Sequence, residues 1–179
     1  MKNTKSLVLA SLFAAFIALC AFIQVPSVVP FTLQIMAVFI ISGLFKPKTA
    51  FLAVLIYLCI GAVGLPVFAG FKGGLGALFG TSGGYLISFL VIPIIMGIFD
   101  LTIKHRTLSL ILGMTTSLFI IYIFGTLWYT FVYALEGKLN VTFYSAFSVC
   151  VLPFLIPDII KIVLSFAVIT KLRGKFNKI

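Results

Sequence analysis

The chain has 179 residues, of which 63% are hydrophobic and only 9% are charged, and its formal net charge at pH 7 is +10. Because soluble domains carry about a quarter charged residues, this composition excludes a water-soluble surface and predicts an integral membrane protein in a lipid bilayer. The positive charge is expected to meet anionic lipid, and nucleic-acid binding is excluded, since no soluble segment is long enough to form a basic face.

The first predicted membrane helix covers about Leu7–Val25. Its start imitates a secretory signal, but the apolar stretch continues for about 20 residues without a small-residue cleavage site, so we expect a retained helix. One face carries alanines at four-residue spacing, which allows another helix to approach closely in lipid. These are Ala10, Ala14 and Ala18. The spacing leaves open whether the approaching helix belongs to this chain or to another subunit.

Two further helices are predicted before residue 71. Pro26 and Pro30 interrupt the first charge-free run, because proline removes a backbone hydrogen bond from a helix. The second helix, Phe31–Phe45, is short for a full crossing, which needs about 20 residues. The third helix lies in the apolar run Thr49–Phe71.

The segment Gly64–Tyr85 contains eight glycines in 22 residues and is not expected to form a spanning helix. Irregular backbone at membrane depth must lie inside protein or line a wet cavity, since its amide groups find no partner in lipid. We therefore predict an outer loop that dips between helices as a gate or ligand wall. The loop lacks a Gly-Lys-Ser/Thr ending and follows no soluble strand, so any ATPase must be another polypeptide.

The fourth predicted helix, Ser82–Phe99, contains Pro93 and is expected to bend there. The fifth helix lies in the charge-free run Thr107–Leu135, and the terminal helix covers roughly Pro157–Thr170. The predicted fold class is therefore an all-α integral membrane protein with six transmembrane helices and a glycine-rich outer loop between the third and fourth. A single transmembrane domain over residues 1–179 is expected.

Positive charges are unevenly distributed over the loops, and this predicts orientation because Lys and Arg accumulate in cytoplasmic loops. With a cytoplasmic N-terminus, ten Lys and Arg fall on the cytoplasmic side and only Lys72 and Lys138 fall outside. The ten are Lys2, Lys5, Lys46, Lys48, Lys104, Arg106, Lys171, Arg173, Lys175 and Lys178. Both termini are therefore expected to be cytoplasmic.

Asp158 and Lys161 are the evident charges within the membrane-embedded part of the chain. Three residues apart near the start of the last helix, they share one helix face. An ionised side chain at such depth costs at least about 2.5 to 3.5 kcal/mol unless it is paired or hydrated. The two residues can neutralise each other, or they can face an outward-open cavity. In a cavity they fit a small carboxylate that carries N–H donors.

Other residues near the outer face are candidates to complete a pocket. The polar ones are Thr32, Gln34, Lys72, Ser82 and Tyr85. Phe31 and Phe68 are interpreted first as lipid-facing or packing residues, with a pocket wall as the alternative. The cysteines Cys20, Cys59 and Cys150 are interpreted as packing residues, because their spacing fits neither a disulfide framework nor a metal motif.

Catalysis is not expected. An enzyme needs a nucleophile with a base, a metal cluster or two carboxylates at working distance. His105 lies in a basic loop, and Asp100 and Glu136 lie at opposite membrane faces. No cofactor or metal is predicted.

Four motifs occur in a specific order along nearly the whole chain. They are VPFTLQ (Val29–Gln34), GLPVFAG (Gly64–Gly70), GTSGGY (Gly80–Tyr85) and PDIIK (Pro157–Lys161). In this combination the chain resembles the BioY family, the biotin-specific S component of energy-coupling factor (ECF) transporters. That family usually has proline and threonine in the third motif where this chain has Thr81 and Ser82.

The resemblance implies a six-helix subunit in a bacterial cell membrane that captures biotin from outside. The implied partners are a transmembrane coupling subunit and two cytoplasmic ATPases, which together form an ABC importer. Ala10, Ala14 and Ala18 would then face the coupling subunit, and Asp158 and Lys161 inherit the family's biotin-binding role. Further ligand-binding candidates are Gln34, Phe68, Gly73, Gly74, Ser82 and Tyr85.

Biotin suits these residues chemically. Asp158 can accept hydrogen bonds from the ureido N–H groups, whereas Lys161 can meet either the carboxylate or the ureido carbonyl. In a desolvated site each charge-assisted bond contributes about 1.5 to 3 kcal/mol. The alternatives are an S component for another small vitamin and a membrane enzyme that acts on a lipid or prenyl group.

Overall fold

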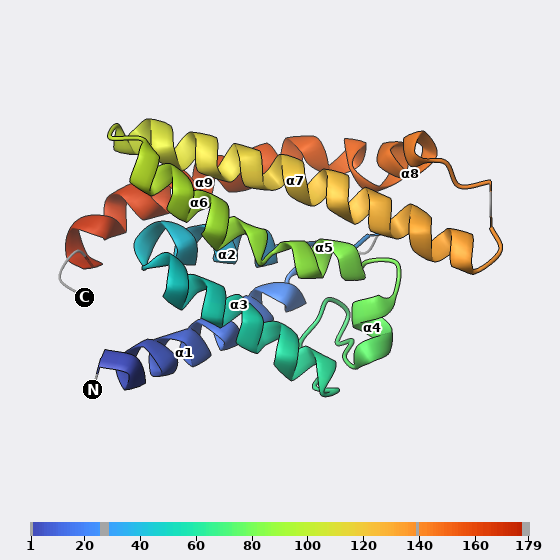
Figure 1. Ribbon diagram of the computed structural model, residues 1–179, viewed down its shortest axis with the longest axis horizontal. Coiled ribbons are helices and arrows are strands. Elements are labelled where there is room, and N and C mark those ends of the chain that lie inside the picture. Colours follow the sequence, from blue (N-terminus) through green and yellow to red (C-terminus); the bar gives the residue numbers. More distant parts are fainter. Residues whose placement is uncertain (1, 26–28, 139, 177–179) are drawn as a thin grey trace.

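The computed structural model describes residues 2–25, 29–138 and 140–176, and the chain is mainly helical (Figure 1). Pro26 and Lys178 lie outside the described residues. The helices are α1 (Lys2–Phe22), α2 (Gln34–Leu44), α3 (Pro47–Ala62), α4 (Leu75–Phe79), α5 (Gly83–Ser88), α6 (Val91–Thr102), α7 (Arg106–Leu135), α8 (Phe143–Cys150), the 3₁₀ turn η1 (Leu152–Phe154) and α9 (Leu155–Phe176).

Four described stretches are long and apolar enough to cross a membrane, and α2 and α3 are shorter apolar helices. The four are Thr4–Phe22, Gly83–Thr102, Arg106–Leu135 and Phe143–Gly174. Their outward faces carry large exposed apolar side chains such as Leu12, Phe119 and Val163. Lipid is the solvent that such faces require, so the chain is a membrane protein.

The helix boundaries differ from the prediction at two proline-containing positions. A two-residue strand, β2 (Phe31–Thr32), pairs antiparallel with β1 (Gln24–Val25), so α2 begins only at Gln34. The predicted fourth helix is divided into α5 and α6, with the break at Phe89 and Leu90 rather than at Pro93. Pro93 lies in the first turn of α6, where a missing N–H costs no helical hydrogen bond.

The predicted small-residue face of α1 is covered by the chain itself. Helix α1 packs along α3 and against α2, and Ala10 and Ala14 are 0% and 2% exposed. Ala18 is half-buried and packs against the hydrophobic core. These alanines therefore pack within the chain, which is one of the two alternatives that their spacing left open. The small side chains that α1 exposes at four-residue spacing are Ser11 and Ala15.

Both chain termini and a cluster of ion pairs lie at the same end of the molecule. The N-terminus of α1 and the C-terminal end of α9 lie at one end, together with the α6–α7 connection (Figure 1). At that end Asp100 forms ion pairs with Arg106 and, at 3.8 Å, with Arg173. Both arginines also donate hydrogen bonds to the Gly43 carbonyl, at 3.2 and 3.4 Å. Helix α4 and the α7–α8 connection lie at the opposite end.

Candidate functional site

The glycine-rich segment between α3 and α5 folds back onto α3. The Phe68 N–H donates to the Lys72 carbonyl at 2.9 Å, and the Gly74 N–H donates to the Gly61 carbonyl at 2.7 Å. The Phe68 side chain is 2% exposed, and its ring fills the space that a side chain at Gly61 would need. Gly74 has φ of +85°, a conformation that glycine adopts without steric cost. The segment is thus anchored and forms a wall over the helices.

Two cavities adjoin each other, and this segment lines one of them. The first contains the ionised pair; we call it the ion-pair cavity. The second is lined in part by the glycine-rich segment; we call it the loop cavity. They share the lining residues Val29, Pro30, Thr32, Tyr85 and Phe89.

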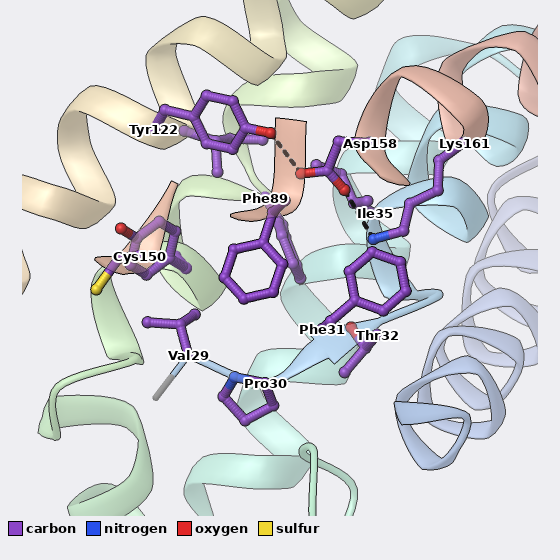
Figure 2. Close-up of a pocket in the computed structure, with 13 residues that line it drawn as sticks. Val29, Pro30, Phe31, Thr32, Ile35, Phe89, Tyr122, Cys150, Asp158 and Lys161 are labelled. Atoms are coloured by element: carbon purple, nitrogen blue, oxygen red, sulfur yellow. Dashed lines mark hydrogen bonds and ion pairs between the residues drawn. The ribbon is translucent and has the colours of Figure 1, made fainter. Parts of the chain in front are cut away.

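The ion-pair cavity contains two buried charges. Asp158 and Lys161 are 6% and 5% exposed, and the Lys161 Nζ donates to Asp158 Oδ1 at 2.8 Å. The Tyr122 hydroxyl donates to the other carboxylate oxygen, Oδ2, at 2.5 Å. The Lys161 Nζ also lies 3.6 Å from the centroid of the Phe31 ring. Figure 2 shows these four side chains converging from α7, α9 and β2.

These contacts offset the cost of burying charge and leave capacity for a ligand. A carboxylate accepts about four hydrogen bonds and an ammonium donates about three. Asp158 receives one donor on each oxygen, and Lys161 gives one donor to Asp158. The pair is therefore neutral as a unit, yet it can still accept from N–H groups and donate to a carbonyl. Mutual neutralisation and a place in a cavity, which the sequence presented as alternatives, occur together.

The loop cavity has a polar edge that is partly used by the fold. The Gln34 amide accepts a hydrogen bond from Thr32 Oγ1 at 2.8 Å and donates to the Tyr57 hydroxyl. Tyr57 in turn donates to the Val67 carbonyl at 3.2 Å. Gln34 therefore connects α2, α3 and the glycine-rich segment. Ser82 also lines this cavity and makes no capping hydrogen bond to α5.

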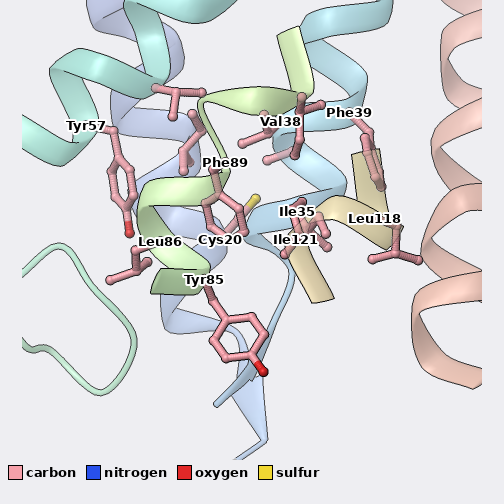
Figure 3. Packing of buried hydrophobic residues seen from close by; sticks show 14 of the residues in the cluster. Cys20, Ile35, Val38, Phe39, Tyr57, Tyr85, Leu86, Phe89, Leu118 and Ile121 are labelled. Atoms are coloured by element: carbon pink, nitrogen blue, oxygen red, sulfur yellow. The ribbon is translucent and has the colours of Figure 1, made fainter. Parts of the chain in front are cut away.

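Tyr85 lines both cavities and is positioned by α7. Its hydroxyl lies 3.1 Å from Thr126 Oγ1, and its ring occupies the space that a Cβ on Gly125 would fill. The Trp128 indole N–H donates to the Gly80 carbonyl at 3.0 Å, which fastens the GTSGGY motif to α7. In Figure 3 Tyr85 lies at the edge of the buried apolar cluster that supports the cavities.

Comparison with known proteins identifies the family. The family model described as the BioY family matches residues 1–178. The chain belongs to the BioY family. Among curated BioY proteins, a probable biotin transporter from Pyrococcus horikoshii is 36% identical over 173 residues, which cover 96% of this chain and 98% of that protein. Biotin transporter BioY2 from Lactococcus lactis is 35% identical and covers 92% of this chain and 88% of its own length.

A solved structure agrees with the BioY assignment in three dimensions. The crystal structure of the S-component for biotin from an ECF-type ABC transporter matches with a TM-score of 0.83 and 26% sequence identity. The match covers 97% of this chain and 93% of that one. The arrangement of helices around the two cavities therefore belongs to an S-component fold.

In this BioY family member the predicted site residues are distributed over both cavities. Asp158, Lys161 and Tyr85 line the ion-pair cavity. Tyr85 also lines the loop cavity, together with the three predicted residues Gln34, Phe68 and Ser82. Gly73 and Gly74 line neither. Gly73 lies against the Leu65 carbonyl, and the Gly74 N–H donates to the Gly61 carbonyl, so both shape the segment. Their contact with a ligand stays a prediction.

Sequence reasoning missed Tyr122 as a site residue and assigned Phe31 first to packing or lipid contact. Tyr122 belongs to a buried stripe on α7 that also contains Gly125, Thr126 and Tyr129. Their spacing of three and four residues, with polar groups recurring on one face of an apolar helix, was a usable signal. The partner of Tyr122 was not readable, because Asp158 lies on a different helix.

Proposed function

We propose that this chain is a high-affinity biotin-binding subunit of an ECF-type ABC importer. It captures biotin from the outer side and delivers it inward with a transmembrane coupling subunit and two cytoplasmic ATPases. The observation that carries the proposal is the buried Asp158–Lys161 pair, which lines a cavity and retains unused hydrogen-bonding capacity. BioY family membership supports biotin as the ligand.

The chemistry of biotin matches the cavity. Its ureido ring offers two N–H donors and one carbonyl, and the neutral Asp158–Lys161 pair offers the complementary acceptor and donor. Its thiolane ring is apolar, and Phe31, Phe89 and Phe154 line the same cavity. The polar contacts fix orientation while apolar burial supplies affinity, at about 25 cal/mol per Å² of apolar surface removed from water.

The proposed topology has six crossings in one domain over residues 1–179. They are α1, α2, α3, α5 with α6, α7, and α8 with α9. Both termini are cytoplasmic, and α4 with the glycine-rich segment is on the outer side of a bacterial plasma membrane. The grouping of both chain ends at one end of the molecule supports this orientation, as does the excess of Lys and Arg in the segments assigned to the inside.

The proposed contact with the coupling subunit lies on the outward face of α1. Ala10 and Ala14 are buried within the chain, so they are not available to a partner in this conformation. Ser11 and Ala15 are exposed and four residues apart, which is the small-residue spacing that permits close helix approach in lipid.

Equilibrium binding tests the proposed function. Radiolabelled biotin is added to the purified chain in detergent, and unlabelled biotin, riboflavin and thiamine compete for the site. We expect saturable binding at about one site per chain, displaced by biotin alone. Displacement by another vitamin would support the alternative S component, and absence of biotin binding by folded protein would contradict the proposal.

A further inference from the structure

We propose that Lys72 binds the carboxylate of the ligand, so that one ligand molecule spans both cavities. Its uncharged ureido ring lies at Asp158 and Lys161, and its anionic tail reaches the rim of the loop cavity. This inference rests on the proposed biotin binding and adds the orientation of the ligand and a residue that selects for its negative charge.

Lys72 has no acidic partner among the described residues. The sequence contains only three acidic residues, and each is already paired in the described parts of the chain. Asp158 pairs with Lys161, Glu136 pairs with Lys138, and Asp100 pairs with two arginines. Lys72 forms an ion pair with none of them, although it lines the loop cavity. Among the described residues, Lys72 is therefore a cation at the cavity that no acidic side chain balances.

The ion-pair cavity favours the uncharged end of the ligand. Asp158 and Lys161 neutralise each other at 2.8 Å, so an incoming carboxylate would gain the attraction of Lys161 only against the repulsion of Asp158. Like charges in a desolvated site are strongly unfavourable. A ureido group has two N–H donors and one carbonyl acceptor but no net charge. It can therefore form hydrogen bonds with Asp158 and Lys161 while their ion pair stays intact. The carboxylate is thereby directed to the other cavity.

The position of Lys72 is set by the fold of the glycine-rich segment. Its carbonyl accepts the Phe68 N–H at 2.9 Å, and the Phe68 ring is buried against α3 and packs edge-on to Tyr57. These contacts fix the backbone at Lys72, while its side chain is exposed at the rim. Lys138, the other lysine in a segment assigned to the outer side, already has Glu136 at 3.0 Å. The hydrogen bond that Lys138 donates to that carboxylate raises the pKa of Lys138 above its usual value.

A pair of ligands that differ only in charge tests the inference. Affinities for biotin and for biotin methyl ester are measured on the purified wild-type chain and on Lys72→Gln, with Lys138→Gln as the matched control. We expect wild type to prefer biotin over the ester about tenfold, the scale of one charge-assisted hydrogen bond. Lys72→Gln is expected to lose this preference by weakening biotin alone. Lys138→Gln is expected to keep it, and Lys72→Arg is expected to restore most of it.

The possible results are separable. If wild type binds biotin and the ester equally, or if Lys72→Gln retains the full preference, the carboxylate does not meet Lys72 and the inference is overturned. Loss of the preference in Lys161→Gln but not in Lys72→Gln would also overturn it, because the carboxylate would then lie at the ion pair. If folded wild type binds neither ligand, the proposed function itself fails. A reduction of both affinities in Asp158→Asn, with the preference kept, supports the assigned orientation.

Discussion

At the scale of single residues, the central feature is the set of contacts that stabilises two buried charges, Asp158 and Lys161, which are 6% and 5% exposed. Asp158 receives hydrogen bonds from Lys161 and Tyr122, and Lys161 also lies over the Phe31 ring. A cation over an aromatic face gains about 0.5 to 2 kcal/mol, depending on how far it is desolvated. Lys161, Tyr122 and Phe31 belong to α9, α7 and β2, so these contacts connect the three elements.

Tyr122 is expected to position Asp158 for the ligand. Tyr122→Phe removes the hydroxyl donor while keeping the ring, so Asp158 Oδ2 loses its partner and the carboxylate can rotate. We expect biotin affinity to fall about threefold to tenfold, as for the loss of one hydrogen bond to a charged group. Equilibrium binding measures the change, with Tyr133→Phe on the same helix as the control. Unchanged affinity in Tyr122→Phe would show that Asp158 is held by Lys161 alone.

At the scale of elements, the sequence allows predictions where lipid imposes a clear energetic cost. Asp158 and Lys161 were identified because charge in an apolar helix needs compensation, and the glycine-rich segment was recognised as irregular backbone. The break between α5 and α6 was placed at Pro93, but it lies at Phe89 and Leu90. Proline in a first helical turn breaks no hydrogen bond, so the sequence marked the neighbourhood of the break and not its position.

Close packing between α5 and α7 depends on glycine. A Cβ on Gly125 would overlap the ring of Tyr85, and overpacking of this kind costs about 1 to 3 kcal/mol. Gly125→Ala is therefore expected to lower thermal stability in detergent and to weaken biotin binding by shifting Tyr85. Gly174→Ala is the control, because nothing lies within 4 Å of its Cβ position. Equal melting temperatures and affinities for the two variants would contradict the packing argument.

Helix α1 has two faces with different expected roles. Ala14→Trp places a large ring in a site that is 2% exposed, so we expect this variant to be destabilised and to lose biotin binding. Ala15→Trp changes an exposed face. It is expected to fold and bind biotin normally, but to fail to co-purify with the coupling subunit and to abolish ATP-driven uptake. Normal assembly of Ala15→Trp would place the coupling contact elsewhere.

At the scale of the whole molecule, the sequence could predict which segments are apolar but not how their faces pair. The spacing of Ala10, Ala14 and Ala18 allowed either an internal or an external neighbour, and only the packing of α1 along α3 decides between them. The same holds for the contact between Tyr122 and Asp158, which joins α7 to α9. Contacts between helices that are far apart in the sequence cannot be predicted from the local pattern of an apolar sequence.

The orientation of the molecule can be tested by labelling. Single cysteines replace Lys72, Lys138 or Lys46 in a background in which the exposed Cys59 is changed to serine. We expect an impermeant thiol reagent to label positions 72 and 138 in intact cells, and position 46 only after the membrane is opened. The reverse pattern would invert the topology and put the cavities on the cytoplasmic side.

Biotin binding by site variants tests most directly whether the buried ion pair forms the ligand site. Affinity is measured for Asp158→Asn and Lys161→Ala, with Ser165→Ala as the control on the same helix, because Ser165 is fully buried and its hydroxyl has no hydrogen-bond partner in the described parts of the chain. We predict that both site variants bind biotin at least about tenfold more weakly, as expected when a hydrogen bond to a charged group is lost, while remaining folded in the membrane. Ser165→Ala should match wild type. Near-wild-type affinity in both Asp158→Asn and Lys161→Ala would contradict the assignment of the site.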